Sequence, residues 1–192
     1  MRKAALTRNT KETSINLEIN LDSKNRNQFF TNVGFFDHML DSLLLRAGIS
    51  LQMECSGDLQ TGEHHLVEDI GICLGQAIKN ALGDKAGIAR YGTASLPMDE
   101  ALVNCALDIS GRGFLVFNAD IPSQECGGFA TENVEEFLRA LAHNAGITLH
   151  INLLYGKNTH HIIEAIFKAV GVALGQALKV SGTEIPSTKG LL

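Results

Sequence analysis

The sequence contains the motif His-His-x-x-Glu twice, as residues 64–68 and as residues 160–164. Each copy opens an apolar stretch with helical periodicity, and residues four apart lie on the same face of a helix. The first histidine and the glutamate of each copy can therefore bind the same metal ion. Four of the seven histidines of the chain belong to these two copies. The pattern predicts a duplicated metal site that contains His64, Glu68, His160 and Glu164.

The second histidine of each copy, His65 or His161, points about 100° away from the first around a helix and is free to bind a second ion. Two ions with five or six ligands each need more donors than one histidine and one glutamate. His38 and His143 lie in two other apolar helical segments and raise the set to six histidines and two glutamates, which gives three histidines and one glutamate for each ion. His150, inside a strand pattern, is interpreted as structural.

Imidazole and carboxylate ligands without thiolate, with coordination positions left vacant, suit Mn, Fe, Co or Zn. A closed structural zinc site is the alternative, although such sites usually favour cysteine. Cys55, Cys73, Cys105 and Cys126 are widely spaced, with no Cys-x-x-Cys motif. We therefore expect free thiols, buried at Cys73 and Cys105, in place of disulfides or a zinc-thiolate site.

The duplication extends beyond the motif. An offset of 96 residues aligns residues 64–78 with residues 160–174 without a gap, and an offset of 98 aligns residues 47–51 with residues 145–149. Self-similarity of this kind predicts two tandem half-domains of nearly 100 residues that form one compact unit.

Each half-domain is expected to contain three strands and two helices. For the first half-domain, residues 1–90, we predict strands over 14–21 and 28–31, a helix over 36–46 stopped by Gly48, a strand over 49–55 and a helix over 64–82. For the second, residues 91–192, we predict strands over 101–109 and 114–120, a helix over 131–143, a strand over 147–153 and a helix over 160–180. Both halves read β-β-α-β-α. Strands outnumber crossover helices, which argues against a Rossmann sheet and for an α+β fold whose sheets cover a helical layer.

Composition excludes several classes of protein. The chain has 192 residues, of which 45% are hydrophobic, so it can bury a sizeable core. A net charge of −5 with no basic run predicts no nucleic-acid partner. The uncharged apolar stretches are far shorter than the roughly 20 residues of a membrane span, and the start Met-Arg-Lys-Ala-Ala lacks an apolar signal segment. We expect a cytoplasmic enzyme with no membrane partner.

Cationic and hydroxyl side chains in the predicted loops are suited to a phosphate group. Arginine can make bidentate contacts with phosphate, and lysine and serine supply ammonium or hydroxyl contacts. The candidates are Arg90, Arg112, Lys157, Ser187 and Lys189.

Six segments, in this order along the chain, together resemble the imidazoleglycerol-phosphate dehydratase family. They are residues 34–41, 64–69, 97–101, 142–146, 155–161 and 186–190. The resemblance covers nearly the whole chain and implies conversion of imidazole glycerol phosphate to imidazole acetol phosphate and water in histidine biosynthesis. It also implies a duplicated fold like the second domain of ribosomal protein S5 and two Mn ions per active site. The implied assembly is a homo-oligomer of 24 subunits, built from trimers, with active sites shared between subunits.

The resemblance also implies roles for single residues. Glu12 is implied as the acid–base group that moves protons, and Asp99 is the second candidate. The implied phosphate pocket consists of Arg90, Arg112, Ser187 and Lys189, with Lys157 as a neighbour. The chain departs from the family pattern at Gly113, where the family usually has proline, and at Ala130, where it often has aspartate; neither is a proposed ligand.

Two other functions stay open on the residues alone. Two metal ions can also activate water for phosphate ester cleavage, as in a binuclear metallohydrolase. The chain could also be a non-catalytic assembly that binds or stores metal. Hydrolases of that kind usually use bridging aspartates, whereas histidine dominates this ligand set, and metal storage needs no cationic pocket for phosphate. Both considerations favour the dehydratase.

Overall fold

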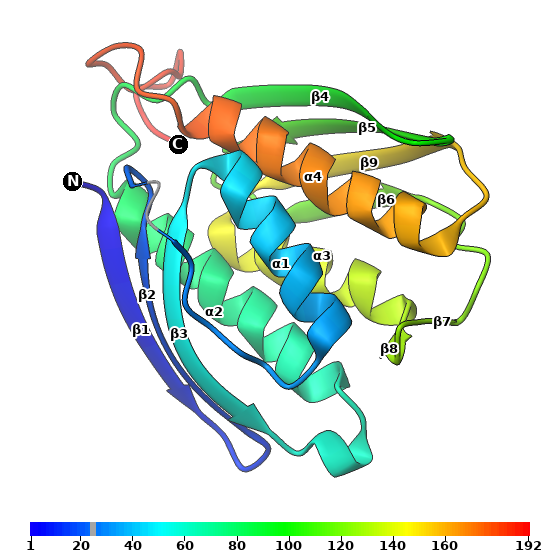
Figure 1. Cartoon of the computed structure of the whole chain (residues 1–192). Coiled ribbons are helices and arrows are strands. Elements are labelled where there is room, and N and C mark those ends of the chain that lie inside the picture. The colour runs from blue at the N-terminus through cyan, green and yellow to red at the C-terminus, as the bar shows by residue number, and fades with distance from the viewer. Residues whose placement is uncertain (24–25) are drawn as a thin grey trace.

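The computed structural model describes residues 1–23 and 26–192. Within these residues, four α-helices lie between a three-stranded and a four-stranded sheet (Figure 1). The first half contains the strands β1 (Lys3–Asn9) and β2 (Thr13–Asn20), the helix α1 (Gly34–Ala47), the strand β3 (Ser50–Gly57), a 3-10 turn over Leu59–Thr61 and the helix α2 (His64–Leu82). The second half contains β4 (Tyr91–Met98), β5 (Ala101–Asp108), β6 (Phe114–Asn118), the short β7 (Glu125–Cys126) and β8 (Phe129–Ala130), α3 (Glu132–Ala145), β9 (Thr148–Tyr155) and α4 (Thr159–Leu178).

The two halves interlock through their helices. The smaller sheet has the order β1-β2-β3 and is antiparallel, and the larger has the order β4-β5-β9-β6, with β6 parallel to β9. Helix α2 packs on β1 and β2, and α4 packs on β4 and β5, while α1 packs on α4 and α3 packs on α2. Each helix pair thus joins one helix from each half. The predicted α+β class, with sheets covering a helical layer, is confirmed.

Two of the four edge strands of these sheets, β1 and β4, were not predicted from the sequence. The predicted strand over residues 28–31 is wrong, because Gln28 forms only an isolated bridge with Gln52. In the first half β1 supplies the missing strand, which keeps the β-β-α-β-α order, and in the second half β4 is an additional strand. Strand β1 has only Ala4 and Leu6 as apolar side chains on its inward face, and both are only partly buried. This weak apolar alternation does not mark a strand in the sequence. Strand β4 contains Pro97, which an edge strand tolerates because its missing N–H need not join a ladder.

Two equivalent glycines end the first helix of each half. Gly48 follows α1 with φ +70°, and Gly146 follows α3 with φ +68°. The N–H of each glycine donates to carbonyls of the last helical turn, and glycine adopts this left-handed conformation without a steric penalty. The predicted helix stop at Gly48 is confirmed. The 98-residue offset therefore reflects a duplicated helix cap.

Glycine also sets how closely the helix pairs approach. A Cβ at Gly171 of α4 would lie 2.3 Å from the carbonyl oxygen of Leu43 in α1. A Cβ at Gly75 of α2 would lie 2.7 Å from the carbonyl oxygen of Leu141 in α3. Gly75 and Gly171 are the glycines that the duplicated sequence aligns, so one packing solution is used twice.

We expect Gly171→Ala to lower the free energy of unfolding by about 1–3 kcal/mol, the usual cost of overpacking. The added methyl group would meet backbone of the facing helix, which cannot move aside as a flexible side chain can. Thermal and urea denaturation of the metal-free chain measure the effect. Gly34→Ala in α1 is the matched control, because a Cβ there meets nothing within 4 Å. Equal stability of the two variants would contradict this packing argument.

Helix α4 is the central core helix. By length and composition alone this 20-residue helix, with a mean hydropathy of 1.4 in its best window, could cross a membrane, and it is the one such helix among the described residues. However, 72% of that window is buried inside the protein. A helix that packs against a sheet on one side and α1 on another is apolar on most of its circumference. Glu164 and Lys168 interrupt its apolar sequence.

All four cysteines are free, and Cys73 and Cys105 are buried, as expected. Burial raises the pKa of the Cys105 thiol to about 12 and that of Cys73 to about 11. Because a metal ligand must be the thiolate, these two residues are unsuited to binding an ion.

Candidate metal and acid–base site

His38, His160 and Glu164 converge between α1 and α4. Glu164 Oε2 lies 3.0 Å from His160 Nε2 and 3.7 Å from His38 Nε2. One ligand atom from each of the three residues lies within 4.8 Å of the other two, so the group can hold a metal ion. Two imidazoles and one carboxylate form a set of ligands that suits a divalent transition metal ion.

The Glu164 side chain is only 8% exposed, and Lys168 one turn later on α4 places its Nζ 2.5 Å from Glu164 Oε1. Burial by itself would raise the pKa of Glu164, but Lys168, His160 and His38 outweigh that effect and lower it. The carboxylate is thus held in the ionised form that a metal requires. One oxygen faces the histidines and the other faces the lysine.

Helix packing, which the sequence does not reveal, brings His38 to this cluster. Helices α1 and α4 run in the same direction. His38 of α1 is next to Glu164 of α4, and farther along both helices Leu43 is next to Gly171. His38 therefore projects from the early part of α1 towards the first turns of α4.

The first copy of the motif forms a second, smaller group on α2. His64 Nε2 lies 3.8 Å from Glu68 Oε2, as the four-residue spacing predicts. The residue that α3 contributes here is Asn133, whose Oδ1 lies 3.0 Å from His64 Nδ1.

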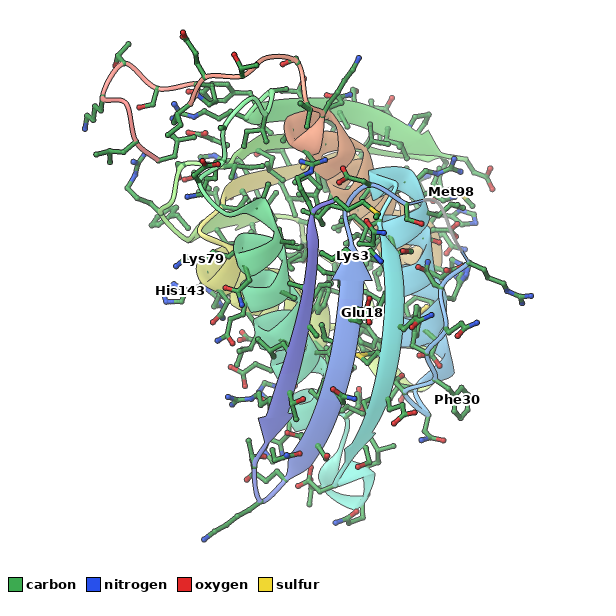
Figure 2. The ribbon with its side chains drawn as sticks, turned by 90° about the vertical axis from the view of Figure 1, so that its left-hand side faces the viewer. Lys3, Glu18, Phe30, Lys79, Met98 and His143 are labelled. Carbon is green, nitrogen blue, oxygen red and sulfur yellow. The ribbon has the colours of Figure 1, made fainter. Side chains whose placement is uncertain are left out.

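His143 does not join His64 within one chain. Helices α2 and α3 are parallel. Asn133 contacts His64 near the start of both helices, and Gln76 Nε2 donates to Asn144 Oδ1 at 3.1 Å farther along. His143 therefore lies near the C-terminal end of α2, and Figure 2 shows it close to Lys79. Its imidazole is exposed. A ligand role for His143 stays a prediction that needs a second chain.

The interpretation of His150 as a structural residue stays a prediction. His150 is exposed on β9, on the face of the sheet that points away from the helices. An exposed imidazole has no buried hydrogen-bonding role that would keep it from a metal. The imidazole of His150, like that of His143, lies at the surface of the chain.

The second histidines of the two motifs point away from the first, as predicted. Ring centroids are 6.0 Å apart for His64 and His65, and 6.2 Å apart for His160 and His161. Each second histidine faces loop carboxylates instead. His65 Nδ1 lies 3.1 Å from Asp58 Oδ2, and this hydrogen bond raises the pKa of His65.

His161 has the equivalent environment in the second half. Its Nδ1 lies 2.7 Å from Glu100 Oε2, and this hydrogen bond raises the pKa of His161. Glu100 also accepts the N–H groups of Asn158 and Lys157 at the start of α4. These contacts, with the Asn158 N–H the largest, lower the pKa of Glu100 to about 2. In the described contacts, Lys157 reaches Glu100 through its backbone N–H.

The two acid–base candidates occupy equivalent hairpins. Glu12 lies in the loop between β1 and β2, and its Oε2 lies 3.9 Å from His65 Nδ1. Asp99 lies in the loop between β4 and β5, and its Oδ2 lies 3.5 Å from His161 Nε2. Each half thus places an exposed carboxylate beside the second histidine of its motif. A group in this position can accept or donate a proton at a substrate bound near that histidine.

The hairpin that carries Glu12 is fixed to α2. The hydroxyl of Thr13 donates to the buried Asp69, and Arg8 Nε donates to the same carboxylate at 2.9 Å. Thr10 Oγ1 accepts the N–H of Glu12 at 3.1 Å. This network raises the pKa of Arg8, chiefly through its hydrogen bond with Asp69.

The phosphate-binding candidates lie elsewhere in the chain. Arg90, with φ +71°, donates from Nε to Asp108 at 2.7 Å and from Nη1 to the Pro186 carbonyl at 2.8 Å. It therefore contacts the tail that carries Ser187 and Lys189, and the N–H of Lys189 donates to Ser187 Oγ at 3.2 Å. Arg112 Nη1 donates to the Ser110 carbonyl at 3.4 Å, just beyond the end of β5. Four of the five candidates, Arg90, Arg112, Ser187 and Lys189, thus lie in this region, whereas Lys157 lies just before α4, beside Glu100.

One chain does not bring Arg90, Arg112, Ser187 or Lys189 to the metal group. The N–H of Arg90 donates to the carbonyl of Ala177, near the end of α4, whereas His160 lies in its first turn. Seventeen residues of helix, at 1.5 Å each, separate His160 from Ala177 by about 25 Å. Figure 1 shows the same separation, with the C-terminal tail at one end of α4 and the β7–β8 hairpin towards the other.

Known proteins of one family are similar to this chain along most of its length. The family model described as imidazoleglycerol-phosphate dehydratase matches residues 31–174. The chain belongs to the imidazoleglycerol-phosphate dehydratase family. A protein of that name from Lactococcus lactis subsp. cremoris (strain SK11) is 55% identical over 100% of this chain and 98% of its own length. Another from Oceanobacillus iheyensis is 52% identical, with both chains covered completely.

Two crystal structures of imidazoleglycerol-phosphate dehydratases have the same fold. The Staphylococcus aureus protein is 44% identical, with a TM-score of 0.86 over 93% of this chain and 99% of its own. The Pyrococcus furiosus protein, solved in complex with (S)-C348, is 39% identical, with a TM-score of 0.83 over 97% of this chain and 100% of its own. The predicted resemblance to the imidazoleglycerol-phosphate dehydratase family is confirmed.

Four residues whose polar side chains contact the motif histidines or Glu164 in this member of the dehydratase family were not candidates from the sequence. They are Asp58, Glu100, Asn133 and Lys168. The spacing of Lys168, four residues after Glu164 on one helix, is a signal that the sequence does contain. The other three come from loops or from the opposite half, where no local pattern relates them to the histidines.

Proposed function

We propose that this chain is an imidazoleglycerol-phosphate dehydratase, a hydro-lyase that converts imidazole glycerol phosphate to imidazole acetol phosphate and water in histidine biosynthesis. The observation that carries the proposal is the convergence of His38, His160 and Glu164, with loop carboxylates beside the adjacent His161. Family membership supplies the substrate.

We infer that the active site uses two Mn ions, or other divalent transition metal ions. His38, His160 and Glu164 would bind one ion, and His64 with Glu68 would contribute to the other. The fit is supported by the clustered donor atoms and the ionised carboxylate of Glu164. His65, His161 and His143 face away from these groups and would bind ions of neighbouring chains. When bound, the ions supply Lewis-acid stabilisation of negative charge on the substrate imidazole.

The protein groups have separate tasks in this proposal. Glu12 holds and moves the proton, with Asp99 as the second candidate, because each side chain extends from an anchored hairpin beside a histidine. The phosphate group is bound by cationic and hydroxyl groups at the other end of the helical layer. That set is Arg90, Arg112, Ser187 and Lys189. Lys157, the remaining substrate-binding candidate, lies just before α4.

The 25 Å of helix between these sets, about 1.5 Å per residue, exceeds the length of a small phosphorylated imidazole. We therefore propose that the active site is shared between chains of a homo-oligomer, with 24 subunits built from trimers. The exposed His143 and His150 support such sharing. Four free cysteines support a cytoplasmic location, where thiols stay reduced. We propose no nucleic-acid or membrane partner.

Metal removal is expected to dissociate the assembly. A site with ligands from two chains makes metal binding and association one equilibrium, because each ion stabilises the assembled state by mass action. Light scattering during EDTA treatment should show a large particle that becomes a smaller unit, a trimer on the proposed scheme. Added Mn should restore mass and activity together. EDTA saturated with Mn beforehand is the control, and an unchanged mass after complete metal removal would exclude metal-dependent assembly.

The reaction itself is tested by incubating the Mn-loaded chain with imidazole glycerol phosphate. Formation of a product that absorbs as an enolised ketone supports dehydration. Release of inorganic phosphate would instead identify a metallohydrolase. Retention of metal with neither product would identify a non-catalytic metal-binding assembly.

A further inference from the structure

Asn133 is a buried polar residue of α3 that contacts the first metal motif from the opposite half of the chain. We propose that Asn133, held by Glu63, fixes the tautomer and orientation of His64 and so directs the His64 Nε2 lone pair towards a divalent cation. This role deepens the proposed metal site and rests on it. Asn133 is a positioning residue in this proposal, because it acts through His64.

Hydrogen bonds link the side chains of Glu63, Asn133 and His64 in series. Asn133 is 2% exposed. Its Oδ1 lies 3.0 Å from His64 Nδ1, and its Nδ2 donates to Glu63 Oε1 at 3.1 Å. The same Glu63 oxygen accepts the N–H of Ala130 at 2.7 Å. Glu63 is thus anchored by the backbone of β8, and Asn133 lies between Glu63 and the imidazole.

The donors and acceptors in this series of hydrogen bonds determine which tautomer His64 adopts. The Glu63 oxygen accepts, so the amide must present its N–H₂ to Glu63 and its carbonyl oxygen to His64. An amide oxygen cannot donate, so Nδ1 of His64 must carry the proton. A neutral imidazole has one N–H, which leaves the lone pair on Nε2. That nitrogen lies 3.8 Å from Glu68 Oε2, where the ion is expected.

A hydrogen bond to the other ring nitrogen is the usual means by which proteins orient a metal-binding histidine, and losing it typically costs 10- to 100-fold in metal affinity. The second copy of the motif is supported differently. His160 lies edge-on to Phe35 with ring centroids 5.3 Å apart, and its glutamate is held by Lys168. A change at Asn133 should therefore affect the His64 group and spare the His160 group.

The test compares Asn133→Leu, which keeps the size but removes the acceptor, with the double variant Glu63→Gln and Asn133→Asp. In the double variant the glutamine side chain can donate to the new carboxylate, which still accepts from His64. Long-range 1H–15N NMR of the metal-free, histidine-labelled full chain reports the tautomer, with His64→Gln used for assignment. Titration with Mn²⁺ reports affinity, and Glu164→Gln removes the other group from the measurement.

We expect wild-type His64 to carry its proton on Nδ1. In Asn133→Leu this preference should be lost, and the affinity of the His64 group for Mn²⁺ should fall by 10- to 100-fold. The double variant should recover both the tautomer and the affinity. A proton on Nε2 in the wild-type chain would overturn the proposal. So would an unchanged tautomer and affinity in Asn133→Leu, or, if that variant does not fold, no recovery in the double variant. If the wild-type chain binds no Mn²⁺, the metal site fails, whereas the tautomer is still measured independently.

Discussion

Replacement of Glu164 by alanine is expected to lower bound metal and abolish turnover. Its Oε2 is the atom that faces both His160 and His38, so the ion would lose the anionic ligand of the group. Lys168, 2.5 Å from the other oxygen, would then face the two imidazoles without a counterion and repel a cation. Metal content after desalting, measured by elemental analysis, and turnover of imidazole glycerol phosphate check the result.

Glu135→Ala is the matched control for this variant. Glu135 is also a helical glutamate paired with a cation four residues later, but its partner is Arg139 and its side chain is 41% exposed. Metal content and rate should stay at the wild-type level. Full metal occupancy with a wild-type rate in Glu164→Ala would remove Glu164 from the site.

Glu12→Gln is expected to lower the rate by roughly 10²- to 10⁴-fold, the usual contribution of a general acid–base group. Glutamine keeps the size of the side chain but cannot exchange the proton. The hairpin should be undisturbed, because the Glu12 N–H donates to Thr10 and its carbonyl accepts the N–H of Asp58. Metal content and KM should therefore stay close to wild type, as elemental analysis and steady-state kinetics will measure.

Two companion variants make this result interpretable. Asp99→Asn changes the carboxylate in the equivalent hairpin of the second half. If Glu12→Gln turns over normally while Asp99→Asn is slow, Asp99 is the acid–base group. Lys189→Ala should have the opposite signature to Glu12→Gln, with a raised KM and little change in kcat, because it removes phosphate binding.

The sequence by itself determined the features that depend on local geometry. The four-residue spacing placed His64 with Glu68 and His160 with Glu164 on single helical faces, and the structure contains both pairs. Adjacent histidines diverge around a helix, so His65 was expected to face other groups. The duplicated glycine at the helix cap is likewise a local requirement of backbone conformation. Periodicity and dihedral preference are properties of a short segment, so a sequence pattern reports them directly.

The tertiary structure alone decided which of these groups meet. His38 reaches Glu164 because α1 and α4 pack in parallel, whereas the same parallel packing carries His143 to the far end of α2. Asn133 reaches His64 across the boundary between the halves, and Glu12 reaches His65 through an edge hairpin that the sequence pattern does not indicate. Such contacts depend on helix direction, on the close approach that glycine permits and on sheet edges. These are set by the packing of whole elements, which leaves no periodic signal in the sequence.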